Sequence, residues 1–329
     1  MKRTRMLLAL SVILVLLIPS FGFIAETAKP ISIGAILGVQ HPAFDAVYNG
    51  FLDSLTDHGY VEGTDYTLDY QNANNDQSIM STIGDRFVSN NVDFILSVGT
   101  QATVMLAGKT EDIPIMGSAI TDYVSARLAD ANEKPGHNVS GTSDMQDIAA
   151  QIALILRLAP EVKTVGVLYN SGETNSVVQA GIAKAAIEAL GLTYAEVTIT
   201  NSSEVQQGME RIAAISDAIY LPTDNTVAVA MPIVYGVSVD AKIPVVCGEE
   251  GMTKVGGLAT IGVNYYDIGY QTGDMAVRFW EEGLVIGDMP IELQSKAAYA
   301  INGTIAEEIG IEIPEDLLEY VFYMDEAAE

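Results

Sequence analysis

The sequence has few of the residues that build disulfides and metal centres. Among its 329 residues there is one cysteine, Cys247, so no disulfide can form within the chain. The three histidines, His41, His58 and His137, are scattered and do not match the spacing of zinc motifs. We therefore expect no metal site and no cofactor. Cys247 lies in an apolar run and is interpreted as a buried structural residue.

Basic residues are also scarce. The chain has 16 lysines and arginines against 43 aspartates and glutamates, which gives a formal net charge of −27. Such a surface repels the phosphates of nucleic acids and anionic lipid headgroups. We therefore expect no nucleic acid among its partners. The acidic excess favours solubility and does not by itself indicate a cationic ligand.

The motifs of common enzymes with doubly wound sheets are missing as well. No GxGxxG follows the first predicted strand, and the chain contains no P-loop, no nucleophile elbow and no spaced set of histidines and carboxylates. The sequence therefore favours a binding protein without catalytic residues. An enzyme on the same fold is the alternative, and turnover of a metabolite by the purified protein would favour it.

The N-terminus has the pattern of an export signal. Basic residues at positions 2, 3 and 5 precede an apolar run over residues 6–18, the length of a signal-peptide core. Read through to Ile24, the apolar stretch is also just long enough to span a bilayer. We expect export, with residues 1–25 either cleaved as a signal peptide or retained as an anchor. The segment holds no cysteine, which excludes lipid attachment at a lipobox.

The most informative pattern is an internal repeat. The segment SIGAIL at Ser32 matches TVGVLY at Thr164, and each leads through a helical pattern to a glycine, Gly59 or Gly191. Both pairs are 132 residues apart. Because any two α/β segments share apolar strands and glycine turns, one such match would mean little.

Further matches follow in the same order along the two halves. DFILSVG at Asp93 matches DAIYLP at Asp217, and Asp147 matches Asp267, where each aspartate is expected to cap a helix. Matches in a conserved order favour duplication of a unit of about 120 residues over chance likeness of α/β segments.

Each half is predicted to alternate short strands with amphipathic helices. The strands are apolar runs without clean alternation, as expected when helices cover both faces of a sheet. Helical crossovers such as 44–58 and 177–190 make neighbouring strands parallel and the connections right-handed. The predicted fold is therefore α/β, with two similar doubly wound parallel-sheet lobes.

Ligands of open parallel sheets bind beyond the carboxyl ends of the strands, where helix N-termini expose backbone N–H groups. In two facing lobes, the loops after equivalent strands would meet across a cleft. These loops are rich in hydroxyls, amides and carboxylates and poor in cations, which suits a neutral or zwitterionic solute. The same residue types are also ordinary caps and turn formers, which is the alternative for each position taken singly. The loops are 38–44, 99–102 and 118–122 in the first half, and 170–176, 222–226 and 248–251 in the second.

An amino acid would find partners there for each of its groups. Its carboxylate would prefer N–H and hydroxyl donors at helix starts, as at Thr100 or Ser171. Its ammonium would prefer a carboxylate, with Asp122, Asp224 and Glu249 as candidates. The aromatic residues that could stack on an apolar side chain are Phe44, Tyr169, Tyr265 and Tyr266.

Several stretches taken together resemble the ABC transporter substrate-binding proteins of the tryptophan-binding type. They are ILGVQHPAFDAV, VGVLYNSGETNSVVQ, YLPTDNTVA, AKIPVVCGEEGM and NYYDIGYQTGDMAV, within a resemblance that covers about residues 30–320. The resemblance implies a type I periplasmic-binding-protein fold with a hinge, and a ligand among the aromatic amino acids. It implies ligand-binding positions at Gln40, Thr100, Gln101, Thr121, Asp122, Ser171, Asn175, Asp224, Asn225 and Glu249.

The chain departs from that family pattern at two places. Bacterial members often carry a lipobox cysteine, which this chain lacks, so its mode of surface retention stays open. In the last loop an acidic pair, Glu249 and Glu250, stands where one acid is typical.

The resemblance and the repeat together predict the organisation of the chain. Residues 30–145 form the first lobe, joined by a returning segment at about 265–290, and residues 146–264 form the second lobe. Residues 290–329 form a third hinge crossing and a C-terminal tail. The expected partners are a small-molecule ligand and the membrane permease and ATPase of an ABC importer, outside the cytoplasm. A ligand-sensing module of a signalling system is the alternative.

Overall fold

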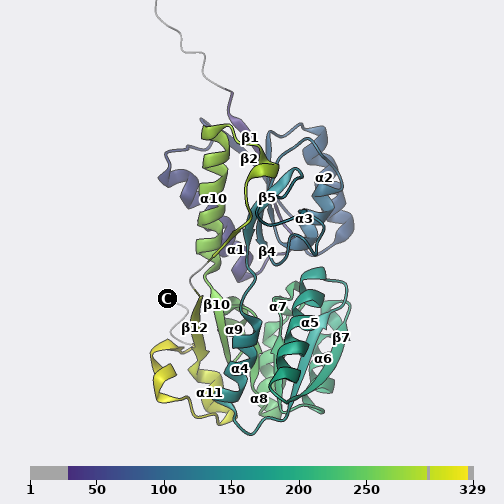
Figure 1. Ribbon diagram of the computed structural model, residues 1–329, viewed down its shortest axis with the longest axis vertical. Helices are drawn as coiled ribbons and strands as arrows, with labels where there is room; N and C mark the ends of the chain where they lie inside the picture. The colour runs from purple at the N-terminus through teal and green to yellow at the C-terminus, as the bar shows by residue number, and fades with distance from the viewer. Residues whose placement is uncertain (1–28, 295–296, 325–329) are drawn as a thin grey trace, which may run out of the picture.

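The apolar runs of the sequence form the strands of two separate sheets, one in each lobe (Figure 1). The structure is a computed structural model and describes residues 29–294 and 297–324. The proposed signal peptide or anchor at residues 1–25 lies outside the described residues. Within the described part of the chain, no helix is long and apolar enough to cross a membrane.

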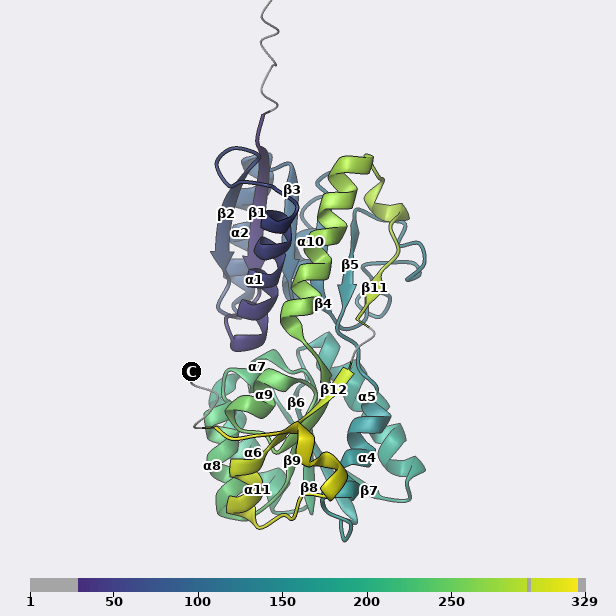
Figure 2. The ribbon, with the colours of Figure 1, turned by 90° about the vertical axis from the view of Figure 1, so that its left-hand side faces the viewer.

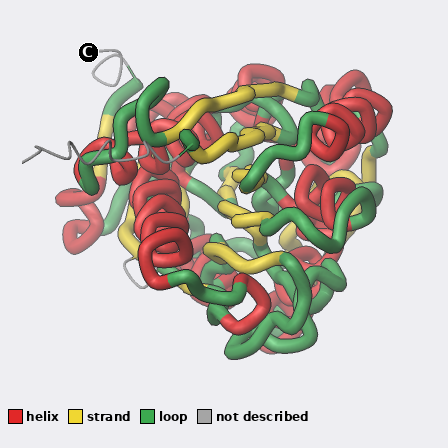
Figure 3. Tube along the Cα trace, turned by 90° about the horizontal axis from the view of Figure 1, so that it is seen from above, coloured by secondary structure: helices red, strands yellow, loops and turns green. Residues whose placement is uncertain are grey.

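The first lobe holds a sheet in the order β11-β5-β4-β3-β1-β2, in which all paired strands run parallel. Its helices lie on both sides of the strands (Figure 3). The strands are β1 (Ile31–Leu37), β2 (Tyr66–Asn72), β3 (Phe94–Val98), β4 (Ile115–Ile120), β5 (Val139–Ser143) and β11 (Glu292–Leu293). The helices are α1 (Pro42–Asp57), α2 (Gln77–Ser89), α3 (Thr100–Ala107), α10 (Tyr265–Glu282) and the short η2 (Ile286–Asp288).

The second lobe repeats this plan with the order β13-β12-β10-β9-β8-β6-β7. β12 runs antiparallel to β10 and is an addition that the repeat did not predict. The strands are β6 (Thr164–Asn170), β7 (Thr193–Ile199), β8 (Ala218–Leu221), β9 (Val245–Cys247), β10 (Ala259–Val263), β12 (Ala297–Asn302) and β13 (Val321–Phe322). The helices are α4 (Ile148–Leu158), α5 (Thr174–Ala189), η1 (Ser202–Glu204), α6 (Val205–Ala213), α7 (Asn225–Ala228), α8 (Met231–Ala241), α9 (Glu250–Val255), α11 (Gly303–Ile309) and η3 (Glu315–Tyr320).

The prediction of two similar doubly wound α/β lobes is confirmed. The two copies of the predicted repeat begin with equivalent strands, β1 and β6. Each of them lies between the second and third strands of its own half. The predicted cap Asp147 accepts a hydrogen bond from the Ala150 N–H. The prediction for Asp267 is wrong: Asn264 caps α10 by accepting from the Tyr266 and Asp267 N–H groups, so Asp267 lies in the first turn.

Over residues 29–324, the sheet order requires the chain to pass between the lobes at three places. These are between Ser143 and Ile148, between Val263 and Tyr265, and between Leu293 and Ala297. The segment that returns to the first lobe includes β11, which pairs with β5 and ends three residues beyond the boundary suggested at 290.

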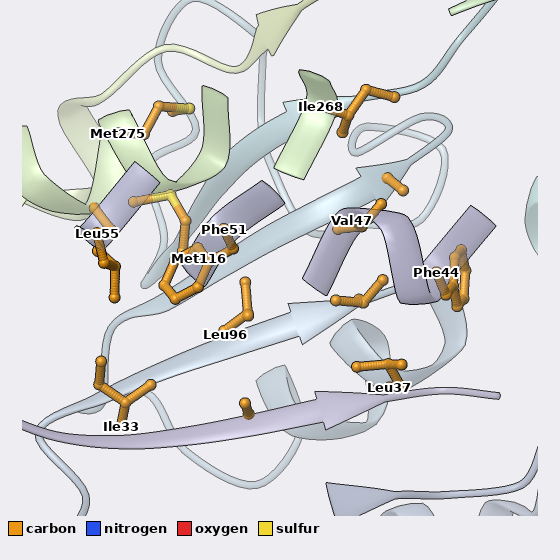
Figure 4. Close-up of a cluster of buried hydrophobic side chains, with 14 of the residues drawn as sticks. Ile33, Leu37, Phe44, Val47, Phe51, Leu55, Leu96, Met116, Ile268 and Met275 are labelled. Carbon is orange, nitrogen blue, oxygen red and sulfur yellow. The ribbon is translucent and has the colours of Figure 1, made fainter. Parts of the chain in front are cut away.

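One of the two hydrophobic cores of the first lobe lies between α1, α10 and the sheet (Figure 4), and the other lies on the opposite face, beneath α2 and α3. α1 begins with Pro42 at its first turn, where the missing N–H is not needed, and turns its apolar face toward the strands. The side chains that meet there are those of Phe44, Val47, Phe51 and Leu55 from α1, Ile33, Leu37, Leu96 and Met116 from the strands, and Ile268 and Met275 from α10.

Glycine lets α10 lie directly against α1, as Figure 2 shows. A Cβ atom at Gly269 would come within 1.9 Å of the Val47 carbonyl oxygen, and one at Gly50 within 2.1 Å of the Tyr266 carbonyl oxygen. No side chain fits at such distances. This contact holds α10, which follows the second crossing, against the first lobe. It thereby also sets the position of Tyr265, the first residue of α10, between the lobes.

Candidate functional site

A pocket lies between the lobes at the carboxyl ends of the strands. About 310 Å³ of space there is free of protein atoms, a volume that includes space open to the solvent. The first lobe and the first crossing contribute His41, Phe44, Thr100, Ala119, Thr121, Asp144 and Tyr265, and the second lobe contributes Asn175, Thr223, Asp224, Asn225, Ala228, Glu249 and Met252.

Two of the buried carboxylates cap short helices of the second lobe. Asp224 accepts from the backbone N–H groups of Asn170 at 2.6 Å and Val227 at 2.8 Å. Burial raises its pKa, and the neighbouring charge of Glu173 adds to the effect. Glu249 accepts from the N–H groups of Gly251 at 2.5 Å and Met252 at 2.6 Å. Burial raises the pKa of Glu249 to about 7, although these two hydrogen bonds act in the opposite direction.

A third carboxylate, Asp144, lies on the first crossing between the lobes. It is buried and accepts from the Tyr265 hydroxyl at 2.6 Å and the Thr121 hydroxyl at 3.0 Å. Burial raises its pKa, and these two hydrogen bonds oppose the shift. Asp144 therefore joins the end of β4, the hinge and the start of α10 at one point of the pocket wall.

Asn175 presents an acceptor without a donor. Its Nδ2 donates to the Thr223 carbonyl at 2.8 Å, and this bond fixes which way the amide faces. Its Oδ1 is buried and has no hydrogen-bond partner among the residues that the structure describes. Leaving a buried carbonyl unpaired costs about 1–3 kcal/mol. The atom is therefore suited to receive an N–H from a bound molecule.

The lining combines negative charge with helix N-termini. Three carboxylates line the pocket, and its lining residues include no lysine or arginine. In such surroundings an ammonium is favoured over an anion, because the carboxylates are already removed from water. An anionic group is instead suited to the first turn of α3 at Thr100, where backbone N–H groups have no intrahelical partner. The pocket can thus hold both ends of a zwitterion.

Apolar atoms line the rest of the pocket, from Phe44, Met252, Tyr265, Ala119 and Ala228. The imidazole of His41 packs against Phe44 with ring centroids 4.3 Å apart. Burial lowers the pKa of His41 to about 4, so the ring is neutral at pH 7 and adds no charge. This wall suits a planar, mostly apolar side chain.

The structure brings together six of the ten site residues predicted from the sequence. Those that line the pocket are Thr100, Thr121, Asn175, Asp224, Asn225 and Glu249.

The other four predicted site residues lie outside the pocket lining. Gln40 is exposed and accepts from the Asn72 amide. Asp122 accepts from the backbone N–H and the hydroxyl of Ser125 and so closes its own turn. Ser171 is exposed. Gln101 points past the pocket and donates to the Gly172 carbonyl of the other lobe at 3.3 Å.

Sequence reasoning missed Asp144, and took Tyr265 only as one of several aromatic candidates. Both follow the last strand of their half, β5 or β10, at the points where the chain crosses between lobes. They do not lie in the loops after the first, third and fourth strands, from which the candidate residues were taken. Their position directly after the fifth strand of each half is the signal in the sequence that points to them.

The described residues contain no group of three or more histidine, cysteine, aspartate or glutamate side chains that could hold a metal ion. Cys247 is buried in the core of the second lobe, and burial raises the pKa of its thiol, which keeps it protonated.

Comparison with known proteins relates this chain to a family over nearly its whole length. The family model described as "ABC transporter substrate binding protein" matches residues 32–324. A "Tyrosine-binding protein" of Clostridioides difficile (strain R20291) is 37% identical over 277 residues, which cover 84% of this chain and 80% of that protein.

Two solved structures, one with a bound ligand and one without, have the same fold. The crystal structure of an ABC domain in complex with L-Trp from Streptococcus pneumonia has a TM-score of 0.86 and 35% identity, and the match covers 90% of this chain and 99% of that one. The ligand-free, open structure of a substrate binding protein with adhesive properties from Clostridium difficile has a TM-score of 0.69 and 38% identity, over 89% of this chain and 98% of that one. The overall superposition is therefore closer for the L-Trp complex than for the ligand-free, open structure.

The duplicated α/β lobes, the polar pocket between them and the match over residues 32–324 lead to one conclusion. The chain belongs to the family of ABC transporter substrate binding proteins.

Proposed function

We propose that the chain is the extracytoplasmic binding component of an ABC importer and that it binds an aromatic amino acid in the pocket between the lobes. The observation that carries the proposal is the unpartnered Oδ1 of Asn175 in a pocket lined by three carboxylates. Relatives named for tyrosine and solved with L-Trp support the choice of ligand.

Each group of an amino acid has a partner of matching chemistry in this proposal. The ammonium donates to Asn175 Oδ1 and lies in the field of Asp144 and Glu249. The carboxylate accepts from the first turn of α3 at Thr100. The aromatic ring lies against the apolar wall of Phe44 and its neighbours.

Binding by both lobes gives the protein its function in transport. A ligand can shift the lobes toward a closed arrangement only by as much as it prefers that arrangement. Contacts from both lobes supply the preference, since Thr100 and Asp144 belong to one side and Asn175 and Glu249 to the other. The closed form is what the permease, with its ATPase, would recognise, and the protein itself performs no chemistry.

Calorimetric titration with amino acids tests the ligand. We expect tight binding of tyrosine, tryptophan or phenylalanine, much weaker binding of leucine, and no binding of sugars. A response to sugars or nucleosides alone would reject the ligand assignment and leave the family unaffected.

Export is tested separately, because residues 1–25 lie outside the described residues. Mass spectrometry of the N-terminal peptide, with protein isolated from its native host, distinguishes a cleaved signal from a retained anchor. Recovery of the whole protein inside the cytoplasm with its N-terminus intact would contradict export.

A further inference from the structure

We infer that Glu173 is a positioning residue for lobe closure: it orients two acceptors of α7 toward two donors of the first lobe, at the border of the pocket that Asn225 and His41 also line. The inference rests on the proposed function, in which closure around the ligand determines affinity. We call the set Glu173, Asn225, Thr226, His41 and Asn75 the closure latch.

Glu173 is fully buried, and the hydrogen bonds of its carboxylate all come from the start of α7. Its Oε2 accepts from the backbone N–H of Asn225 at 2.9 Å and from its side-chain Nδ2 at 2.8 Å. Its Oε1 accepts from the backbone N–H of Thr226 at 2.9 Å and from its hydroxyl at 2.7 Å. A carboxylate with four good donors is satisfied, so Glu173 needs no contact with a ligand.

These four hydrogen bonds decide what α7 presents to the first lobe. Because Nδ2 of Asn225 faces Glu173, its Oδ1 must face the opposite way, toward the first lobe. Because the hydroxyl proton of Thr226 is donated to Glu173, its oxygen is left as an acceptor: one position receives Asn170 Nδ2 of the same lobe at 2.8 Å, and the second faces the first lobe. Glu173 thus turns an amide and a hydroxyl, which could each donate or accept, into two acceptors.

The first lobe presents donors at the matching positions. His41 Nε2 lies 3.3 Å from Asn225 Oδ1, and Nδ2 of Asn75 donates to Thr226 Oγ1 at 3.1 Å. Since Asn225 Oδ1 can only accept, Nε2 of the neutral His41 ring carries the proton. Asn75 has a positive φ of 58°, a conformation that asparagine tolerates better than most residues, and this places its amide at the lobe boundary.

The test compares amino-acid affinity in three variants by calorimetry. Asn75→Gly keeps the positive φ available and removes one donor, so Kd should rise about two- to tenfold. In Glu173→Gln, one carboxylate oxygen is replaced by an NH₂ group, which cannot accept hydrogen bonds from the donors of α7. The Kd for the amino acid should therefore rise about tenfold or more. The Kd of the double variant should exceed that of Glu173→Gln by no more than about twofold. Without the Glu173 carboxylate the Thr226 hydroxyl is no longer oriented toward Asn75, so removal of the Asn75 amide has little further effect.

Glu204→Gln is the matched control. The Glu204 carboxylate also accepts hydrogen bonds within the second lobe, from the Thr200 N–H at 2.7 Å and the Thr200 hydroxyl at 3.2 Å, but both come from the turn just before its own helix. Its affinity should equal that of the wild type. Small-angle X-ray scattering at a fixed, subsaturating ligand concentration should show a smaller closed fraction for Asn75→Gly and Glu173→Gln only.

The outcomes separate this inference from the proposed function. If the wild type binds no amino acid, the proposed function fails. If the wild type binds and both latch variants retain its affinity, or their effects simply add, the latch is refuted. Should Glu173→Gln fail to fold, as a thermal melt would show, Asn75→Gly alone decides: unchanged affinity and unchanged closure overturn the inference.

Discussion

We propose that the ligand's ammonium donates to the unpartnered Oδ1 of Asn175. Asn175→Ala tests this when it is combined with a ligand that lacks the ammonium. The substitution removes Oδ1, which we pair with the ammonium, and also the bond from Nδ2 to the Thr223 carbonyl at 2.8 Å. The loss of the second bond weakens every ligand alike. Comparing tyrosine with 3-(4-hydroxyphenyl)propionate, which lacks the amino group, cancels that common loss.

The magnitude follows from the chemistry of the pair. A hydrogen bond to a charged group contributes about 1.5–3 kcal/mol, and each 1.4 kcal/mol is a tenfold change in Kd. The wild type should therefore prefer tyrosine over the analogue by a ratio about 10- to 100-fold larger than that of Asn175→Ala. Calorimetry of two proteins with two ligands gives this coupling energy directly.

Asn201→Ala serves as the control, since Asn201 is an exposed loop residue of the same lobe. It should leave the preference for tyrosine at the wild-type value. If Asn175→Ala also leaves this preference within about twofold of wild type, the ammonium does not bind Asn175 and the reasoning from the unpartnered oxygen is refuted.

Two further predictions concern protonation and packing. Because folding raises the pKa of Glu249 from 4.5 to about 7, this residue favours the folded state most below pH 4.5 and loses that contribution as the pH rises through 7. A bound ammonium favours its carboxylate form, so ligand binding at pH 7 should release protons; calorimetry in buffers of different ionisation enthalpy measures this, and equal enthalpies would contradict it. Gly269→Ala should destabilise the fold by about 1–3 kcal/mol in thermal melts, because its Cβ would meet the Val47 carbonyl. Gly236→Ala, in α8 with nothing within 4 Å of its Cβ, should be neutral or slightly stabilising, and equal melts for the two variants would contradict the close-packing argument.

The repeat in the sequence was enough to predict the fold, because strand and helix periodicity depends on local patterns that duplication preserved. It could not predict β12 and β13, which have no counterpart in the first half and reach the sheet through the third crossing. It also misplaced the cap of α10 at Asp267, because Asn264 three residues earlier already caps the helix by accepting from the Tyr266 and Asp267 N–H groups.

The site was predicted in part, since loop position is readable from the sequence while side-chain direction is not. Thr100 and Gln101 are neighbours at one helix start, yet Thr100 faces the pocket and Gln101 faces the other lobe. Asp122 follows Thr121 but satisfies Ser125 in its own turn. The direction of each side chain depends on which hydrogen-bond partner lies nearest in the folded protein.

The most direct test of the account is a crystal structure of the protein grown with tyrosine or tryptophan. We predict that the amino acid lies between the lobes, with its nitrogen within hydrogen-bonding distance of Asn175 Oδ1 and its ring against Phe44. An amino acid bound elsewhere, or bound to one lobe while the lobes stay apart, would contradict the account.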